Sequence, residues 1–149
     1  MTDYLFEYAS LFAIAFIAAT ILPAYSEVVV VGMAAAGRDP FAIWAVASTG
    51  NTLGSAVNWL LGRYMLHFQN RSWFPFNSDN IERAQTWFQK YGVWSLLMAW
   101  APIFGDALTF IAGLMRVNFV LFFLLTLVGK ATRYALLLGA WEQLNGVLT

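Results

Sequence analysis

The chain has 149 residues, of which 60% are hydrophobic and 11% are charged, and its formal net charge is zero. A soluble domain usually has about 25% charged residues, so these values exclude an ordinary soluble protein and indicate a single membrane domain over residues 1–149. The neutral charge balance gives no reason to expect nucleic-acid binding. Because the chain has no cysteine and a single histidine, we expect no disulfide, no metal site and no cofactor.

The first apolar stretch begins near residue 8, breaks at Pro23 and resumes over residues 28–37. Proline ends an interior helix, and ten residues of helix span only about 15 Å, half a bilayer. The pattern therefore predicts a re-entrant hairpin over residues 8–37, with its tip at Pro23, Ser26 and Glu27. A single kinked span is the alternative. Acidic rather than basic residues precede this stretch, so we expect it to belong to the mature protein.

The next stretch, residues 41–62, contains no charged residue and predicts a full transmembrane helix. Polar residues at helical spacing form one stripe along it: Ser48, Asn51, Ser55 and Asn58. Small residues form a neighbouring ridge of the kind that allows close helix packing: Gly50, Gly54 and Gly62. The ridge permits either a homodimer or packing within one chain. Asn51 either lines a site or only satisfies a helix contact.

Residues 63–92 form the only polar segment, and residues 79–91 within it predict an amphipathic helix in the membrane interface. Basic residues fall mostly on the same side of the membrane as this segment: Arg63, Arg71, Arg83, Lys90 and Arg116. Only Arg38 falls on the other side. The positive-inside rule then places the central loop in the cytoplasm and both termini outside.

The second half of the chain has the same design as the first. Residues 93–116 predict a second re-entrant hairpin, with its tip at Pro102, Gly105 and Asp106. Residues 117–140 predict a second full transmembrane helix. Two bases lie deep in this helix, one turn apart: Lys130 and Arg133.

The two halves are related by an offset of 79 positions (102 minus 23). This offset pairs the unusual residues of each half: Pro23 with Pro102, Glu27 with Asp106, Gly50 with Gly129, Asn51 with Lys130, and Gly54 with Arg133. Because one full span separates the hairpins, they enter from opposite sides, as in inverted-repeat transporters. The predicted fold is an all-α integral membrane protein with two re-entrant hairpins, two transmembrane helices in an inverted repeat, and one interfacial helix.

Four ionisable residues lie inside the most apolar stretches: Glu27, Asp106, Lys130 and Arg133. A charge at bilayer depth is costly and usually marks a functional site. Arg133 can bind a phosphate bidentately and Lys130 can act as a point charge, so with Asn51 these residues predict a binding and translocation site for an anion. The alternative is purely structural, because two acids and two bases sum to zero and can form two permanent salt bridges.

The order and spacing of several short motifs resemble one known family. These motifs are Leu22-Pro23 with Ser26-Glu27, Gly50-Asn51-x-x-Gly54, Gly62-Arg63-Tyr64, Pro102 with Gly105-Asp106, Ala112-Gly113-x-Met115, and Gly129-Lys130-x-x-Arg133. Together they resemble the DedA superfamily, also called SNARE-associated Golgi or VTT-domain proteins, and most closely its short YqaA-like bacterial branch. Longer members carry arginines around the second-hairpin proline, where this chain has Trp100 and Asp106.

The resemblance implies a multi-pass protein of the bacterial inner membrane that moves lipids, such as polyprenyl phosphates or phospholipids, between leaflets, with proton coupling in some members. We therefore expect a lipid or lipid-phosphate translocator whose partners are membrane lipids. The alternatives are a proton-coupled carrier for a small ion or solute and an accessory or assembly factor. A membrane-embedded enzyme is less favoured, because no catalytic nucleophile–base or metal motif is visible.

Overall fold

The computed structural model describes residues 1–20, 25–64, 78–101 and 104–149, and this part of the chain is helical without strands. Its elements are α1 (Thr2–Thr20), α2 (Tyr25–Ala35), α3 (Pro40–Tyr64), α4 (Ser78–Tyr91), the 3₁₀ helix η2 (Gly92–Trp100), α5 (Phe104–Leu114) and α6 (Phe119–Leu148). The all-helical class expected from the sequence is therefore confirmed. The two predicted tip prolines, Pro23 and Pro102, lie outside the described residues.

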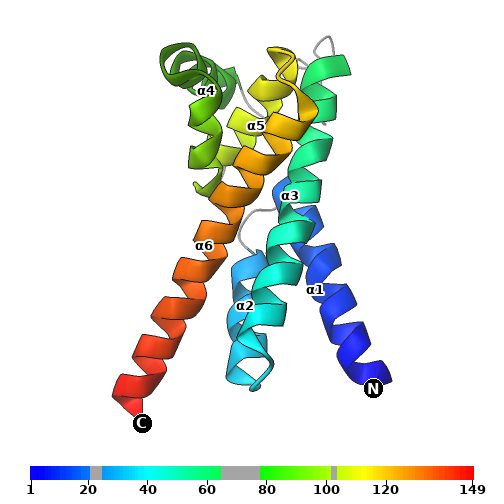
Figure 1. Cartoon of the computed structure of the whole chain (residues 1–149), viewed down its shortest axis with the longest axis vertical. Helices are drawn as coiled ribbons and strands as arrows, with labels where there is room; N and C mark the ends of the chain where they lie inside the picture. Colours follow the sequence, from blue (N-terminus) through cyan, green and yellow to red (C-terminus); the bar gives the residue numbers. More distant parts are fainter. Residues whose placement is uncertain (21–24, 65–77, 102–103) are drawn as a thin grey trace.

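Helices α3 and α6 run along most of the molecule, while the other elements gather at its two ends (Figure 1). Helices α1 and α2 lie at the end where both chain termini are found, and α4, η2 and α5 lie at the opposite end. Each end also has its own apolar core. One core includes Leu96, Leu108 and Phe122, and the other includes Leu11 and Ile43. Both cores rest on α3 and α6, which connect the two ends.

Two of the described helices, α1 and α6, are long and apolar enough to cross a membrane. Helix α1 begins at Thr2 rather than near residue 8, and α6 continues to Leu148 rather than ending at residue 140. Helix α3 covers the predicted span over residues 41–62 and has 25 residues. Its mean hydropathy is lower than that of α1 and α6 because the polar stripe lies along it. Most of that stripe is buried against other helices.

Glycines allow close approach of the backbones. A Cβ atom on Gly50 would lie 2.7 Å from the Phe12 carbonyl oxygen of α1, and one on Gly54 would clash with α1 one turn further on. Gly62 lies in the same way against α5 at Phe110. On α6, a Cβ atom on Gly129 would lie 3.0 Å from a carbonyl oxygen of η2. These four glycines therefore lie at helix contacts within one chain.

The turn between α2 and α3 and the turn between α5 and α6 have the same hydrogen bonds at an offset of 79 residues. At the first, Gly37 has a φ of 76°, Arg38 N–H donates to the Met33 carbonyl, and the Asp39 side chain accepts from Ala42 N–H. At the second, the matching groups are Arg116 with a φ of 58°, Val117 N–H to the Ala112 carbonyl, and the Asn118 side chain accepting from Leu121 N–H. Both turns thus end one helix with a left-handed residue and cap the next.

Helix α4 covers the predicted amphipathic segment over residues 79–91. Its Ala84 and Phe88 are buried against the core of this end of the molecule, while Glu82 and Arg83 are exposed. The Trp87 ring meets Phe104 edge to face at 5.6 Å, which packs α4 on the start of α5. The helix therefore has one apolar side on the protein and one charged side away from it.

Candidate functional site

The four charged residues of the apolar stretches form two ion pairs, each joining α6 to the start of a shorter helix. Lys130 Nζ donates to Asp106 Oδ1 over 2.9 Å, and their side chains are 1% and 8% exposed. The Arg133 guanidinium contacts Glu27 Oε1, and these side chains are 14% and 23% exposed. The structure thus brings together the predicted charges as two separate pairs, of which Glu27–Arg133 is the more accessible.

The local structure explains why these residues meet. Lys130 and Arg133 are three residues apart on α6, so they lie one turn apart on neighbouring parts of its surface. Glu27 and Asp106 lie in the first turns of α2 and α5. An acid is favourable there because the helix dipole is positive at its N-terminus. The positive dipole ends of α2 and α5 are therefore already occupied by acids of the same helices.

A hydroxyl contact lies beside the Glu27–Arg133 pair. Tyr134 on α6 donates to Ser26 Oγ on α2 over 2.9 Å, and both residues are fully buried. Ser26 was predicted at the hairpin tip, but Tyr134 was not predicted as a site residue. A signal was available, because a buried tyrosine hydroxyl usually has a hydrogen-bond partner, and this tyrosine directly follows Arg133 in an apolar helix. The contact ties α2 to α6 next to the ion pair.

The asparagines of α3 hold α1 rather than the charged residues. Asn51 Nδ2 donates to the Ala15 carbonyl and Asn58 Nδ2 to the Ala19 carbonyl, each over 2.9 Å. The Ala19 carbonyl is one of the last four of α1, which lack partners within the helix. Both side-chain oxygens are buried and have no hydrogen-bond partner among the described residues. Asn58 thus supports the end of α1, and Asn51 binds α1 one turn earlier.

The start of α5 is held tightly against η2. A Cβ atom on Gly105 would clash with the Ala99 backbone, so only glycine permits this approach. Asp106 follows directly, and this packing therefore helps to fix the position of its carboxylate. In the part of the chain that the structure describes, no three histidine, cysteine, aspartate or glutamate residues are grouped as a metal site would need.

Comparison with known proteins agrees with this description. A family model described as the VTT domain matches residues 22–143. The chain is 40% identical over 139 residues to the inner membrane protein YqaA of Escherichia coli K12, covering 90% of each chain. It is 35% identical over 136 residues to an uncharacterized protein of Haemophilus influenzae, covering 86% of this chain and 83% of that one. No solved structure matches.

A shorter similarity links the chain to a Staphylococcus aureus protein named undecaprenyl phosphate transporter A. The two are 36% identical over 58 residues, which is 38% of this chain and 29% of that protein.

The apolar helices and the acid–base pairs within apolar stretches indicate an integral membrane protein. The chain belongs to the VTT-domain (DedA) family, in its YqaA-like branch. It is a protein of the bacterial inner membrane, as the names of its relatives state for them.

Proposed function

We propose that this protein moves a lipid or lipid phosphate between the leaflets of the membrane. The observation that carries the proposal is the two acid–base contacts, the partly buried Glu27–Arg133 and the buried Asp106–Lys130, between α6 and the first turns of α2 and α5. Family membership and the name of the S. aureus relative support a lipid phosphate as the cargo. A polyprenyl phosphate is therefore the first lipid to test.

We also propose that α1–α2–α3 and η2–α5–α6 are two copies of one unit in inverted topology. The matching turn hydrogen bonds at Gly37 and Arg116 support this repeat. The placement of α1 and α2 at one end and of η2 and α5 at the other supports hairpins that enter the membrane from opposite sides (Figure 1). In such an arrangement, the first turns of α2 and α5 lie within the membrane rather than at its surfaces.

The two pairs have different roles in this mechanism. A phosphate competes with Glu27 for Arg133, because a guanidinium binds both groups bidentately. This pair is the more exposed of the two, so it meets the phosphate first. Glu27 takes up a proton when its partner is removed, which couples lipid movement to protons. The buried Asp106–Lys130 pair keeps α5 in place while this exchange occurs.

The test uses purified protein in liposomes and a labelled polyprenyl phosphate or phospholipid. Arg133→Ala is expected to reduce movement between leaflets by about 10²-fold, which corresponds to the loss of a bidentate charged contact of a few kcal/mol. Arg133→Lys should give an intermediate rate, because it retains the charge but not the fork geometry. Arg83→Ala on the exposed side of α4 is the matched control and should behave as the wild type.

Each variant must first show an unchanged elution volume and helical circular dichroism. Wild-type movement in folded Arg133→Ala would overturn the proposal. Ion flux without lipid movement in the wild type would instead identify a small-ion carrier.

A further inference from the structure

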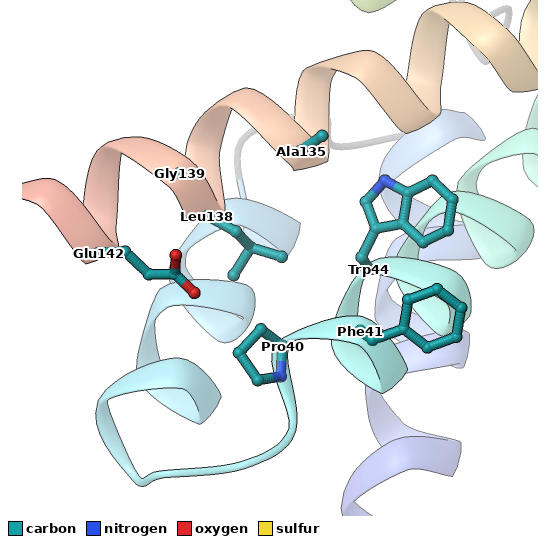
Figure 2. A pocket seen from close by; sticks show the side chains of 7 residues that line it. All are labelled: Pro40, Phe41, Trp44, Ala135, Leu138, Gly139 and Glu142. Carbon is teal, nitrogen blue, oxygen red and sulfur yellow. The ribbon is translucent and has the colours of Figure 1, made fainter.

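An open groove of about 420 Å³ lies between the start of α3 and the second half of α6, and none of the four ion-paired residues lines it. Figure 2 shows Glu142 at one end of it, Phe41 and Trp44 at the other, and Leu138 between them. The remaining lining comes from small or rigid residues: Pro40, Ala135 and Gly139. The volume is within the range of about 300–1,000 Å³ that small-molecule sites have.

The groove has the polarity of a bound amphiphile. Its apolar end is fixed, because Trp44 Nε1 donates to the Ala131 carbonyl of α6 over 2.8 Å. From Ala131 to Glu142 the helix rises about 16 Å at 1.5 Å per residue. Glu142 lies toward the free end of α6, at the end of the molecule that carries both termini (Figure 1). In a membrane, the carboxylate therefore lies toward the head groups and the aromatic rings lie deeper.

The charge of the groove selects the head group. Glu142 is the only charged residue that lines it. Among the residues that the structure describes, the basic residue of the adjoining turn, Arg38, is already engaged: its Nη2 donates to Glu7 over 2.7 Å and its guanidinium lies 4.4 Å from the Tyr4 ring. The Glu7 carboxylate also raises the pKa of Arg38 further above its usual range. An anionic head group would meet an unpaired carboxylate here, whereas an ammonium head group would neutralise it.

We propose that this groove binds a membrane lipid with a primary ammonium head group. The ammonium pairs with the Glu142 carboxylate, and one hydrocarbon chain lies along Leu138 toward Trp44. In the groove, aromatic and aliphatic side chains take the place of the surrounding lipid chains. The bound hydrocarbon chain therefore keeps its apolar contacts. Lipid binding in this groove is independent of the proposed lipid movement at the ion pairs. The groove can bind a lipid even if the protein moves no lipid between the leaflets.

The groove offers a precise blocking variant with a matched control. Gly139 lines the groove, and a Cβ atom there meets no atom within 4 Å, so Gly139→Leu adds a side chain without disturbing the fold. Gly146 lies on the same helix beyond the groove and also has open space around it. Gly146→Leu is therefore the control for Gly139→Leu. Glu82→Gln, on the exposed side of α4, is the control for Glu142→Gln.

The experiment is native mass spectrometry of the purified protein with phosphatidylethanolamine and phosphatidylglycerol of identical acyl chains. We expect the wild type to retain the ethanolamine lipid about fivefold more than the glycerol lipid, the ratio for an ion pair worth about 1 kcal/mol. Glu142→Gln should remove this preference, and Gly139→Leu should reduce retention of the ethanolamine lipid to the level of non-specific adducts. The two controls should match the wild type.

Equal retention of the two lipids by the wild type would overturn the proposal, as would an unchanged preference in Glu142→Gln. Arg133→Ala separates this site from the proposed translocation, because it should lose lipid movement and keep the ethanolamine preference. Loss of the preference in Arg133→Ala would show that the lipid is held at the ion pair and not in the groove.

Discussion

The Asp106–Lys130 pair is the most buried ion pair among the described residues, and it resembles a structural contact more than the Glu27–Arg133 pair does. Removing one partner of a buried pair leaves an uncompensated charge, whereas removing both often costs little. The two pairs therefore offer a direct way to separate support of the fold from transport. The same α6 surface carries both bases, so a change at one position must be compared with a change at the other.

Lys130→Met alone should destabilise the protein by roughly 3–5 kcal/mol, because the Asp106 carboxyl is left buried without its partner. The double variant Asp106→Asn with Lys130→Met should recover most of this loss. Thermal unfolding in detergent, followed by circular dichroism, measures both. Arg38→Gln, which breaks the half-buried pair with Glu7, is the control and should cause a smaller change. A double variant no more stable than Lys130→Met would contradict the structural role.

The sequence was sufficient to find the charged residues but not to pair them. Lys130 and Arg133 are one turn apart, so the sequence alone allowed either base to pair with either acid. The positions of α2 and α5 determine the pairing. Periodicity located the polar stripe of α3, yet Asn51 and Asn58 bind carbonyls of α1. A polar stripe indicates which side of a helix is polar, but it does not indicate which backbone groups of a neighbouring helix lie opposite that side.

At the scale of the elements, α1 begins earlier in the chain than the predicted start of the first apolar stretch near residue 8. The prediction placed that start after the acidic residues Asp3 and Glu7. In the structure, α1 continues through Glu7, whose carboxylate is bound by Arg38 from 31 residues away. A long-range partner that neutralises the charge is not visible in the local pattern. The turn at Gly37 and Asp39, in contrast, depends on a glycine and a capping side chain, which act locally.

The contact between α1 and α3 gives a test at this scale. Gly54→Leu should destabilise the protein by about 1–3 kcal/mol or prevent folding, because the new side chain overlaps the backbone of α1. Gly32→Leu on α2 is the matched control, since a Cβ atom there meets nothing within 4 Å. Leucine is also favoured over glycine in a helix by up to about 1 kcal/mol, so this control should be neutral or stabilising. Thermal unfolding distinguishes the two variants, and equal melting temperatures would refute the close contact.

At the scale of the whole molecule, the two chain termini lie at one end and α4 lies at the other (Figure 1). The excess of basic residues near α4 favours the cytoplasm for that end. This orientation was predicted from the positions of the basic residues and from the number of membrane crossings between them. Neither depends on how the helices pack. The positions of α2 and α5 relative to α6 depend on packing, and they could not be obtained from the apolar pattern alone.

Single cysteines test this orientation, because the chain has none of its own. Thr149→Cys should react in intact cells with a maleimide that cannot cross the inner membrane. Arg83→Cys, exposed on α4, should react only after the cells are opened. The cysteine-free parent is the control for background labelling. Labelling of both positions in intact cells would show that the two ends of the molecule do not face opposite sides.

The contacts between α6 and α2 also determine the order in which the protein can be completed during synthesis. The Tyr134–Ser26 hydrogen bond joins residues 108 positions apart, and the partner of Glu27 lies directly before Tyr134. At about 5–20 residues per second, a ribosome needs roughly 5–20 s to make that stretch. Glu27 therefore has no Arg133 to pair with until nearly the whole chain has been synthesised. Until α6 has been made, we expect the Glu27 carboxylate of the nascent α2 to stay near water or to be shielded by the insertion machinery.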